Sequence, residues 1–175
     1  LQGYLVASFI ATLLPFSDWG SAAYWVFLFA GGALVAAVAL LVGRRDPVVD
    51  PLAAALGILW LTIAIEVLVG TPMQWNGIFG YSPTVAGRFA GLGNLGYAMF
   101  CGADILLAAL IAHRVPGRRG VWLGVALLGV TFVLDGSPMW GADVGGLLSF
   151  VPAACVTATL LLGWRVRLRA IAAFG

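Results

Sequence analysis

The sequence predicts an all-α protein, a bundle of about six transmembrane helices with both termini in the cytoplasm. Of its 175 residues, 62% are hydrophobic and only 9% are charged, and the mean hydropathy is +1.06. A soluble globule of this length needs more polar surface than that. Long apolar runs and a one-sided distribution of arginines support the same conclusion. We expect a single transmembrane domain over residues 1–175.

The spans follow from the apolar runs, because a hydrocarbon core of about 30 Å requires roughly 20 apolar residues as helix. Barrel strands would alternate apolar and polar residues, whereas residues 33–42 are continuously apolar. The first run is short and the chain opens on Leu1, so we expect the N-terminus to be incomplete or processed. The predicted spans are 1–15, 21–43, 51–70, 88–113, 120–134 and 143–164.

The arginines orient the bundle. Of the nine basic residues, eight lie after the second span, between the fourth and fifth, or after the sixth, and these places share one side when there are six spans. The positive-inside rule assigns that side to the cytoplasm. The ninth, Arg88, lies alone on the opposite side, in a segment rich in glycine and polar residues (80–94). The predicted outer loops are 16–20, 71–87 and 135–142.

The composition excludes several kinds of chemistry. The chain has no lysine, so a retinal or pyridoxal Schiff base and a Walker-type phosphate lysine are ruled out. The sole histidine, His113, is at the cytoplasmic end without a second ligand nearby in sequence. Topology accounts for the net charge of +2, so we expect no nucleic-acid partner. We also expect no cofactor. The acidic residues are too scattered to predict a metal, although Asp135 and Asp143 could share a divalent ion.

Two acidic residues lie inside predicted spans. Glu66 is close to the outer end of the third span, and Asp104 is near the membrane midplane in the fourth. A charge at that depth costs several kcal/mol, so Asp104 is expected to face the bundle. It is either protonated and hydrogen-bonded to a hydroxyl such as that of Thr62 or Thr131, or part of a proton or ion relay with Glu66.

Helical spacing predicts which side of the fourth span faces the bundle. Residues three and four positions apart share a face, so one polar stripe is expected to point inward. Its members are Asn94, Tyr97, Cys101, Asp104 and Ala108. The positions predicted to face lipid include Phe100, Leu106 and Leu110.

The outer loops carry a second set of candidates. Arg88 has a guanidinium suited to binding a phosphate or carboxylate, and Gly87, Gly91 and Gly93 either allow close helix packing or expose backbone N–H groups to an anion. Arg88 could instead pair with Glu66, Asp135 or Asp143, and Asp143 could simply cap the sixth span. The expected binding residues are Arg88, Asn94, Tyr81 and Asn76, and the candidate catalytic acids are Asp135, Asp143 and Glu66.

The sequence resembles two families. The segments Gly80-Tyr81-Ser82-Pro83, Gly87-Arg88-Phe89-x-Gly91-x-Gly93-Asn94 and Gly141-Ala142-Asp143-Val144-Gly145-Gly146 resemble a poorly characterised family of actinobacterial and related polytopic membrane proteins. This resemblance implies a multi-pass protein of a bacterial plasma membrane. The segment from Arg88 to Asn94 is also similar to the Arg-x-x-Gly-x-x-x-Asn-x-Asn motif of O-antigen ligases and polymerases. Asn94 stands alone where those enzymes have Asn-Pro-Asn, and they have about twice as many spans.

Three functions remain open from the sequence. The first is binding of a lipid-linked phosphate or glycan carrier at the outer leaflet during cell-envelope biogenesis, with or without catalysis; the resemblance to O-antigen ligases implies a polyprenyl-phosphate-linked lipid. The second is a proton- or ion-coupled transport component that uses Asp104 and Glu66. The third is a structural subunit whose glycine-rich faces pack against other proteins of a larger membrane complex.

Overall fold

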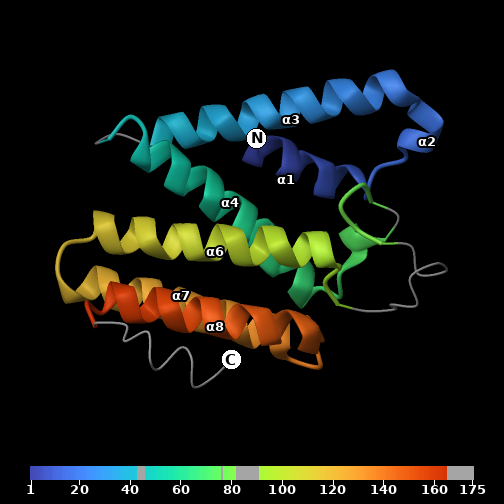
Figure 1. Cartoon of the computed structure of the whole chain (residues 1–175). Helices are drawn as coiled ribbons and strands as arrows, with labels where there is room; N and C mark the ends of the chain where they lie inside the picture. Colours follow the sequence, from blue (N-terminus) through green and yellow to red (C-terminus); the bar gives the residue numbers. More distant parts are fainter. Residues whose placement is uncertain (43–45, 76, 82–90, 165–175) are drawn as a thin grey trace.

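The computed structural model is an all-helical bundle (Figure 1). It describes residues 1–42, 46–75, 77–81 and 91–164, and within these ranges it contains no strand, only an isolated bridge between Trp75 and Tyr81. The helices are α1 (Gln2–Ala11), α2 (Phe16–Trp19), α3 (Ser21–Val42), α4 (Val49–Leu68), the 3-10 helix η1 (Pro72–Gln74), α6 (Asn94–Arg114), α7 (Arg118–Gly136) and α8 (Val144–Leu161). The predicted fold class is confirmed.

Five of the described helices, α3, α4, α6, α7 and α8, are long and apolar enough to cross a membrane. The chain is therefore an integral membrane protein. The first predicted span forms only the ten residues of α1, which at about 1.5 Å per residue reach half of a hydrocarbon core. The count of six spans and the cytoplasmic placement of both termini stay predictions.

The helices are arranged with α6 at the centre. It packs against α4 on one side and against α7 and α8 on the other, while α1 and α3 pack against each other and against α4 (Figure 1). Within their apolar windows, 39% of α6 residues are buried, against 11% in α3 and in α8. Most of the surface of α3 and α8 therefore lies on the outside of the bundle.

The central position of α6 corrects one prediction about its faces. Leu106 is 55% exposed, as expected for a lipid-facing residue, but Phe100 is fully buried and stacks on Trp60 of α4 at a centroid separation of 5.7 Å. Leu110 is half-buried and packs against the same apolar core. The prediction was wrong for Phe100 because α4 covers the side of α6 opposite to the polar stripe.

A bidentate ion pair joins α4 to α6 at one end of the bundle. Arg114 Nε lies 2.6 Å from Asp50 Oδ1, and Arg114 Nη2 donates to Asp50 Oδ2 at 2.8 Å. Asp46 precedes α4 and accepts hydrogen bonds from the backbone N–H groups of Val48 and Val49, which lower the pKa of its carboxyl. We call this the Arg114 end, predicted to be cytoplasmic, and the opposite end the η1 end.

Helices α6 and α7 approach each other closely at Gly124. A Cβ atom at this position would lie 2.7 Å from the backbone oxygen of Ala108 on α6. On the same helix, a Cβ atom at Gly129 would meet nothing within 4 Å, and Gly129 is exposed. Glycine is therefore required by packing at Gly124 and only tolerated at Gly129.

We expect Gly124→Ala to destabilise the bundle and Gly129→Ala to leave stability unchanged or raise it. The added methyl at Gly124 forces the α6 and α7 backbones apart, which costs about 1–3 kcal/mol. At Gly129 the better helix propensity of alanine contributes up to about 1 kcal/mol in the other direction. Thermal unfolding in detergent measures both, and equal melting temperatures for the two variants would contradict the described α6–α7 contact.

Candidate functional site

The structure describes six of the eight residues that the sequence singled out. Arg88 and Asn76 lie outside the described residues. The others fall near the η1 end or in the middle of the bundle, and they divide into two groups with different partners. They are Glu66, Tyr81, Asn94, Asp104, Asp135 and Asp143.

Asp104 lies at the middle of α6 and is fully buried. Its carboxyl lies beside the hydroxyl of Thr131 on α7, although within the described part of the chain neither carboxyl oxygen makes a hydrogen bond. Trp60 Nε1 donates to Thr131 Oγ1 at 2.8 Å. Thr62, the other predicted partner, donates instead to the backbone oxygen of Ile58. Asp104 is thus an acid held at the centre of a membrane protein without a full set of partners.

A column of polar side chains leads from Asp104 toward the η1 end. Cys101 follows one helical turn away, buried, and interacts electrostatically with Asp104, Asp135 and Asp143. The next turn carries Tyr97, whose hydroxyl hydrogen-bonds with the backbone oxygen of Gly146 at 2.7 Å and with Ser149 Oγ at 2.6 Å. Because Tyr97 is half-buried and Ser149 exposed, the column reaches the surface of the bundle between α6 and α8.

The turn between α7 and α8 lies at the η1 end, where hydrogen bonds within it hold Asp135 and Asp143 together. The backbone N–H of Asp143 donates to the backbone oxygen of Asp135 at 3.2 Å, and Gly141 N donates to Leu134 O at 2.9 Å. The Asp143 carboxylate accepts from Gly146 N at 3.0 Å and so caps α8, which confirms its predicted capping role. Both acids are buried, and each makes further interactions.

On the Arg114 side of Asp104 the bundle is apolar. Ala108, one turn further along α6, is fully buried and belongs to a buried cluster with Leu128 of α7, a cluster that also includes Cys101 and Phe150 nearer the η1 end. Ala158 and Leu161 of α8 pack against this cluster. The polar column therefore ends at Asp104, and apolar side chains separate it from the predicted cytoplasmic end.

Glu66 belongs to the second group, which is centred on Gln74. Both side chains are fully buried. Gln74 Nε2 donates to Glu66 Oε2 at 3.0 Å, and Gln74 Oε1 accepts from the backbone N–H of Gly93 at 3.2 Å. One amide therefore joins the end of α4, the 3-10 helix η1 and the start of α6. We call Glu66, Gln74 and Gly93 the Gln74 cluster.

Glycines make room for Gln74. A Cβ atom on Gly96 would lie 2.8 Å from Gln74 Oε1, and one on Gly80 would overlap the Gln74 backbone oxygen. Thr71, which directly precedes η1, has a φ of 59°, an unusual conformation for a β-branched residue. Gly80 and Gly96 thus allow close packing around a buried amide.

Tyr81 and Gly91 link the Gln74 cluster to the α7–α8 turn. The Tyr81 hydroxyl donates to the backbone oxygen of Gly91 at 3.1 Å, and Leu92 N donates to the backbone oxygen of Gly141 at 3.3 Å. Gly91 has a φ of 84°, and a side chain there would overlap Gly141. Asn94, by contrast, is exposed. The prediction that it lies on the same buried face as Cys101 and Asp104 was therefore wrong.

The structure separates the two acids that the sequence had grouped in one relay. Glu66 is bonded to η1, whereas Asp104 lies beside α7, and no hydrogen bond links the two groups in the described ranges. Sequence reasoning also missed Gln74 and Trp60. A glutamine beside Pro72 in an otherwise apolar stretch, followed by closely spaced glycines, was the available signal for Gln74. Nothing in the sequence paired Trp60 with Thr131.

In the part of the chain that the structure describes, no group of three or more histidine, cysteine, aspartate or glutamate residues could hold a metal ion. A comparison with protein-family models, curated proteins and solved structures finds no match. The candidate site therefore rests on its geometry.

We expect Gln74→Leu to destabilise the protein by about 2 kcal/mol or more, because it leaves the Glu66 carboxyl and the Gly93 N–H buried without their partner. Glu66→Gln should cost less, since an amide oxygen can still accept from Gln74. Thermal unfolding of both variants in detergent checks the order. If Glu66→Gln is the more harmful change, the amide is not the centre of the cluster.

Proposed function

We propose that this integral membrane protein is a proton-coupled transport component in which Asp104 takes up and releases the proton. The observation that carries the proposal is the Asp104 carboxyl, fully buried at the middle of α6 with neither oxygen hydrogen-bonded in the described residues. Ionisable groups in such positions are costly and mark proton or ion pathways.

The neighbouring side chains favour a group that changes protonation state. The indole N–H of Trp60 can only donate, so it occupies a lone pair of Thr131 Oγ1 and leaves the Thr131 O–H free to donate toward Asp104. A hydroxyl donor stabilises the carboxylate, while the apolar surroundings stabilise the neutral acid. Uptake of one proton by the carboxylate yields the neutral acid, and its release restores the carboxylate.

The polar column determines from which end of the bundle protons reach Asp104. Cys101, Tyr97 and Ser149 provide polar groups between Asp104 and the η1 end, whereas Ala108 and Leu128 seal the Arg114 side. In this conformation Asp104 therefore exchanges protons toward the η1 end. Transport across the membrane requires α6 and α7 to separate at the seal, near the close contact of Gly124 with Ala108.

We expect Asp104→Asn to abolish proton flux in proteoliposomes driven by a potassium diffusion potential, because an amide cannot take up a proton. Asp104→Glu should retain part of the flux. Glu66→Gln is the matched control, another buried acid neutralised in α4, and it should conduct like the wild type. Wild-type flux no greater than that of protein-free liposomes, or undiminished flux in Asp104→Asn, would refute the proposal.

A second candidate is the binding of a lipid-linked phosphate or glycan carrier at the outer leaflet through Arg88. The supporting observation is that Tyr81 and Gly91, which flank the segment that carries Arg88, are hydrogen-bonded to each other at the η1 end. Gly91 follows Arg88 by three residues in the chain and packs against Gly141. Asp135 and Asp143 of the adjacent turn would then act as acceptor-binding or general-base groups.

We expect native mass spectrometry of the detergent-extracted protein to show a lipid-phosphate adduct that is lost in Arg88→Ala. Arg118→Ala removes an exposed arginine at the opposite end and should retain the adduct. Asp104→Asn should retain it as well, which separates this candidate from proton transport. Loss of the adduct in both arginine variants, or in neither, would count against a site at Arg88.

A further inference from the structure

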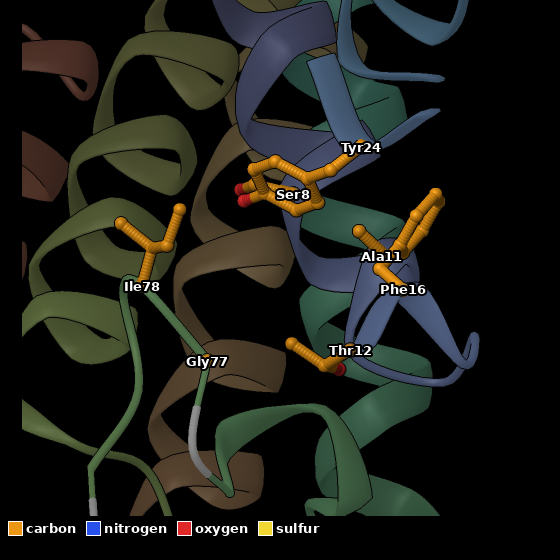
Figure 2. A pocket seen from close by; sticks show the side chains of 7 residues that line it. All are labelled: Ser8, Ala11, Thr12, Phe16, Tyr24, Gly77 and Ile78. Carbon is orange, nitrogen blue, oxygen red and sulfur yellow. The ribbon is translucent and has the colours of Figure 1, made fainter. Parts of the chain in front are cut away.

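A groove near the η1 end shares no lining residue with either polar group, although Thr12, which lines it, contacts the backbone oxygen of Met73 in η1 at 3.3 Å. Four segments line it: α1, α2, the first turn of α3 and the stretch after η1 (Figure 2). Its volume is about 340 Å³ and it is open on one side. The lining residues are Ser8, Ala11, Thr12, Phe16, Tyr24, Gly77 and Ile78.

The depth of the groove in the membrane follows from the helix ends. Tyr24 is in the first turn of α3, which begins at Ser21, and Thr12 directly follows α1. Trp19 and Trp75 are 56% and 49% exposed, as is typical of side chains at a membrane interface. The groove therefore lies at the end of α3 where the membrane interface is expected.

Of the three hydroxyl groups that line the groove, one is available to donate a hydrogen bond to a ligand. Ser8 Oγ donates to the backbone oxygen of Leu5 at 2.7 Å, and Thr12 Oγ1 donates to that of Phe9 at 2.7 Å. The Tyr24 hydroxyl makes no hydrogen bond within the described residues. Figure 2 shows it turned to the same side as the Ser8 hydroxyl, toward Ile78. A fitting ligand is apolar and carries a hydrogen-bond acceptor near the interface.

The dimensions favour a lipid chain over a protein partner. A volume of about 340 Å³ is at the lower end for small-molecule sites and too small for a helix, whose diameter is about 10 Å. Tyr24, which lines the groove, belongs to a helix long and apolar enough to cross a membrane, and its neighbours Trp25 and Phe29 are 49% and 70% exposed. The groove is thus flanked by exposed apolar side chains of a membrane-spanning helix.

We propose that this groove holds one acyl chain of an ester-linked glycerolipid from the leaflet at the η1 end, with the Tyr24 hydroxyl donating to the ester carbonyl. The chain packs against Ala11, Phe16 and Ile78. The lining of this site includes neither Asp104 nor a residue of the Gln74 cluster. The lipid proposal can therefore be tested independently of the proposed transport.

The test is photolabelling in proteoliposomes with a phosphatidylcholine that carries a diazirine on one ester-linked acyl chain, followed by mapping of the adducts by peptide mass spectrometry. We expect adducts on Phe16, Tyr24 and Ile78. The matched control is a second groove of about 240 Å³ between α7 and α8, lined by Phe132, Val133, Gly136, Ser137 and Leu147. Equal labelling of the two grooves would mean non-specific boundary lipid and would overturn the proposal.

Two changes test the hydrogen bond without disturbing the fold. Tyr24→Phe should lower labelling of the groove by about fivefold, the equivalent of one hydrogen bond. An ether-linked lipid, which lacks the carbonyl, should label the wild type as weakly as the ester lipid labels Tyr24→Phe. Undiminished labelling in either case would overturn the role of Tyr24. Ala11→Phe fills the groove, and labelling of a folded Ala11→Phe protein at the wild-type level would overturn the site itself.

Discussion

The structure depends on the burial of α6 between α4 and the α7–α8 pair. In a bilayer, lipid supplies no partner for polar groups, so those on a central helix must be paired by neighbouring helices and turns. The two sides of α6 meet this constraint differently. Toward α4 it presents Phe100, which stacks on Trp60, and toward α7 and α8 it presents Asp104, Cys101 and Tyr97. An apolar side and a polar side thus share one helix.

Close backbone approach allows this arrangement. Gly96 gives space to the side chain of Gln74, Gly124 brings α7 against Ala108, and Gly91 lets the start of α6 contact Gly141. Each position would meet an oxygen atom if it carried a Cβ. Small residues at such contacts are the usual means by which membrane helices associate, because van der Waals packing replaces the hydrophobic effect there. At these three positions glycine therefore serves close packing.

The two buried polar groups serve different purposes. In the Gln74 cluster one amide side chain joins three segments and holds the η1 turn against the bundle. Asp104 has no comparable set of donors within the described ranges, which leaves it able to change its protonation state. Glu66 Oε1 also makes no hydrogen bond within the described ranges, but Gln74 holds the other oxygen of that carboxyl in place. A buried carboxyl with no hydrogen bond at either oxygen is costly and persists where function requires it. This contrast is why Asp104, and not Glu66, is the centre of the proposed transport.

The sequence by itself determined the membrane class, the all-helical fold, the burial of Asp104 and Cys101, and the ends of five long spans to within about three residues, except that α6 begins at Asn94 and not at 88. These follow from hydrophobicity and from helical periodicity, which are local properties of the chain. Only the tertiary structure decided that Phe100 is buried, that Asn94 is exposed, that Gln74 joins Glu66 to Gly93, and that Trp60 positions Thr131 beside Asp104. Each of these depends on which helices become neighbours, and non-local packing leaves no periodic signal in a single sequence.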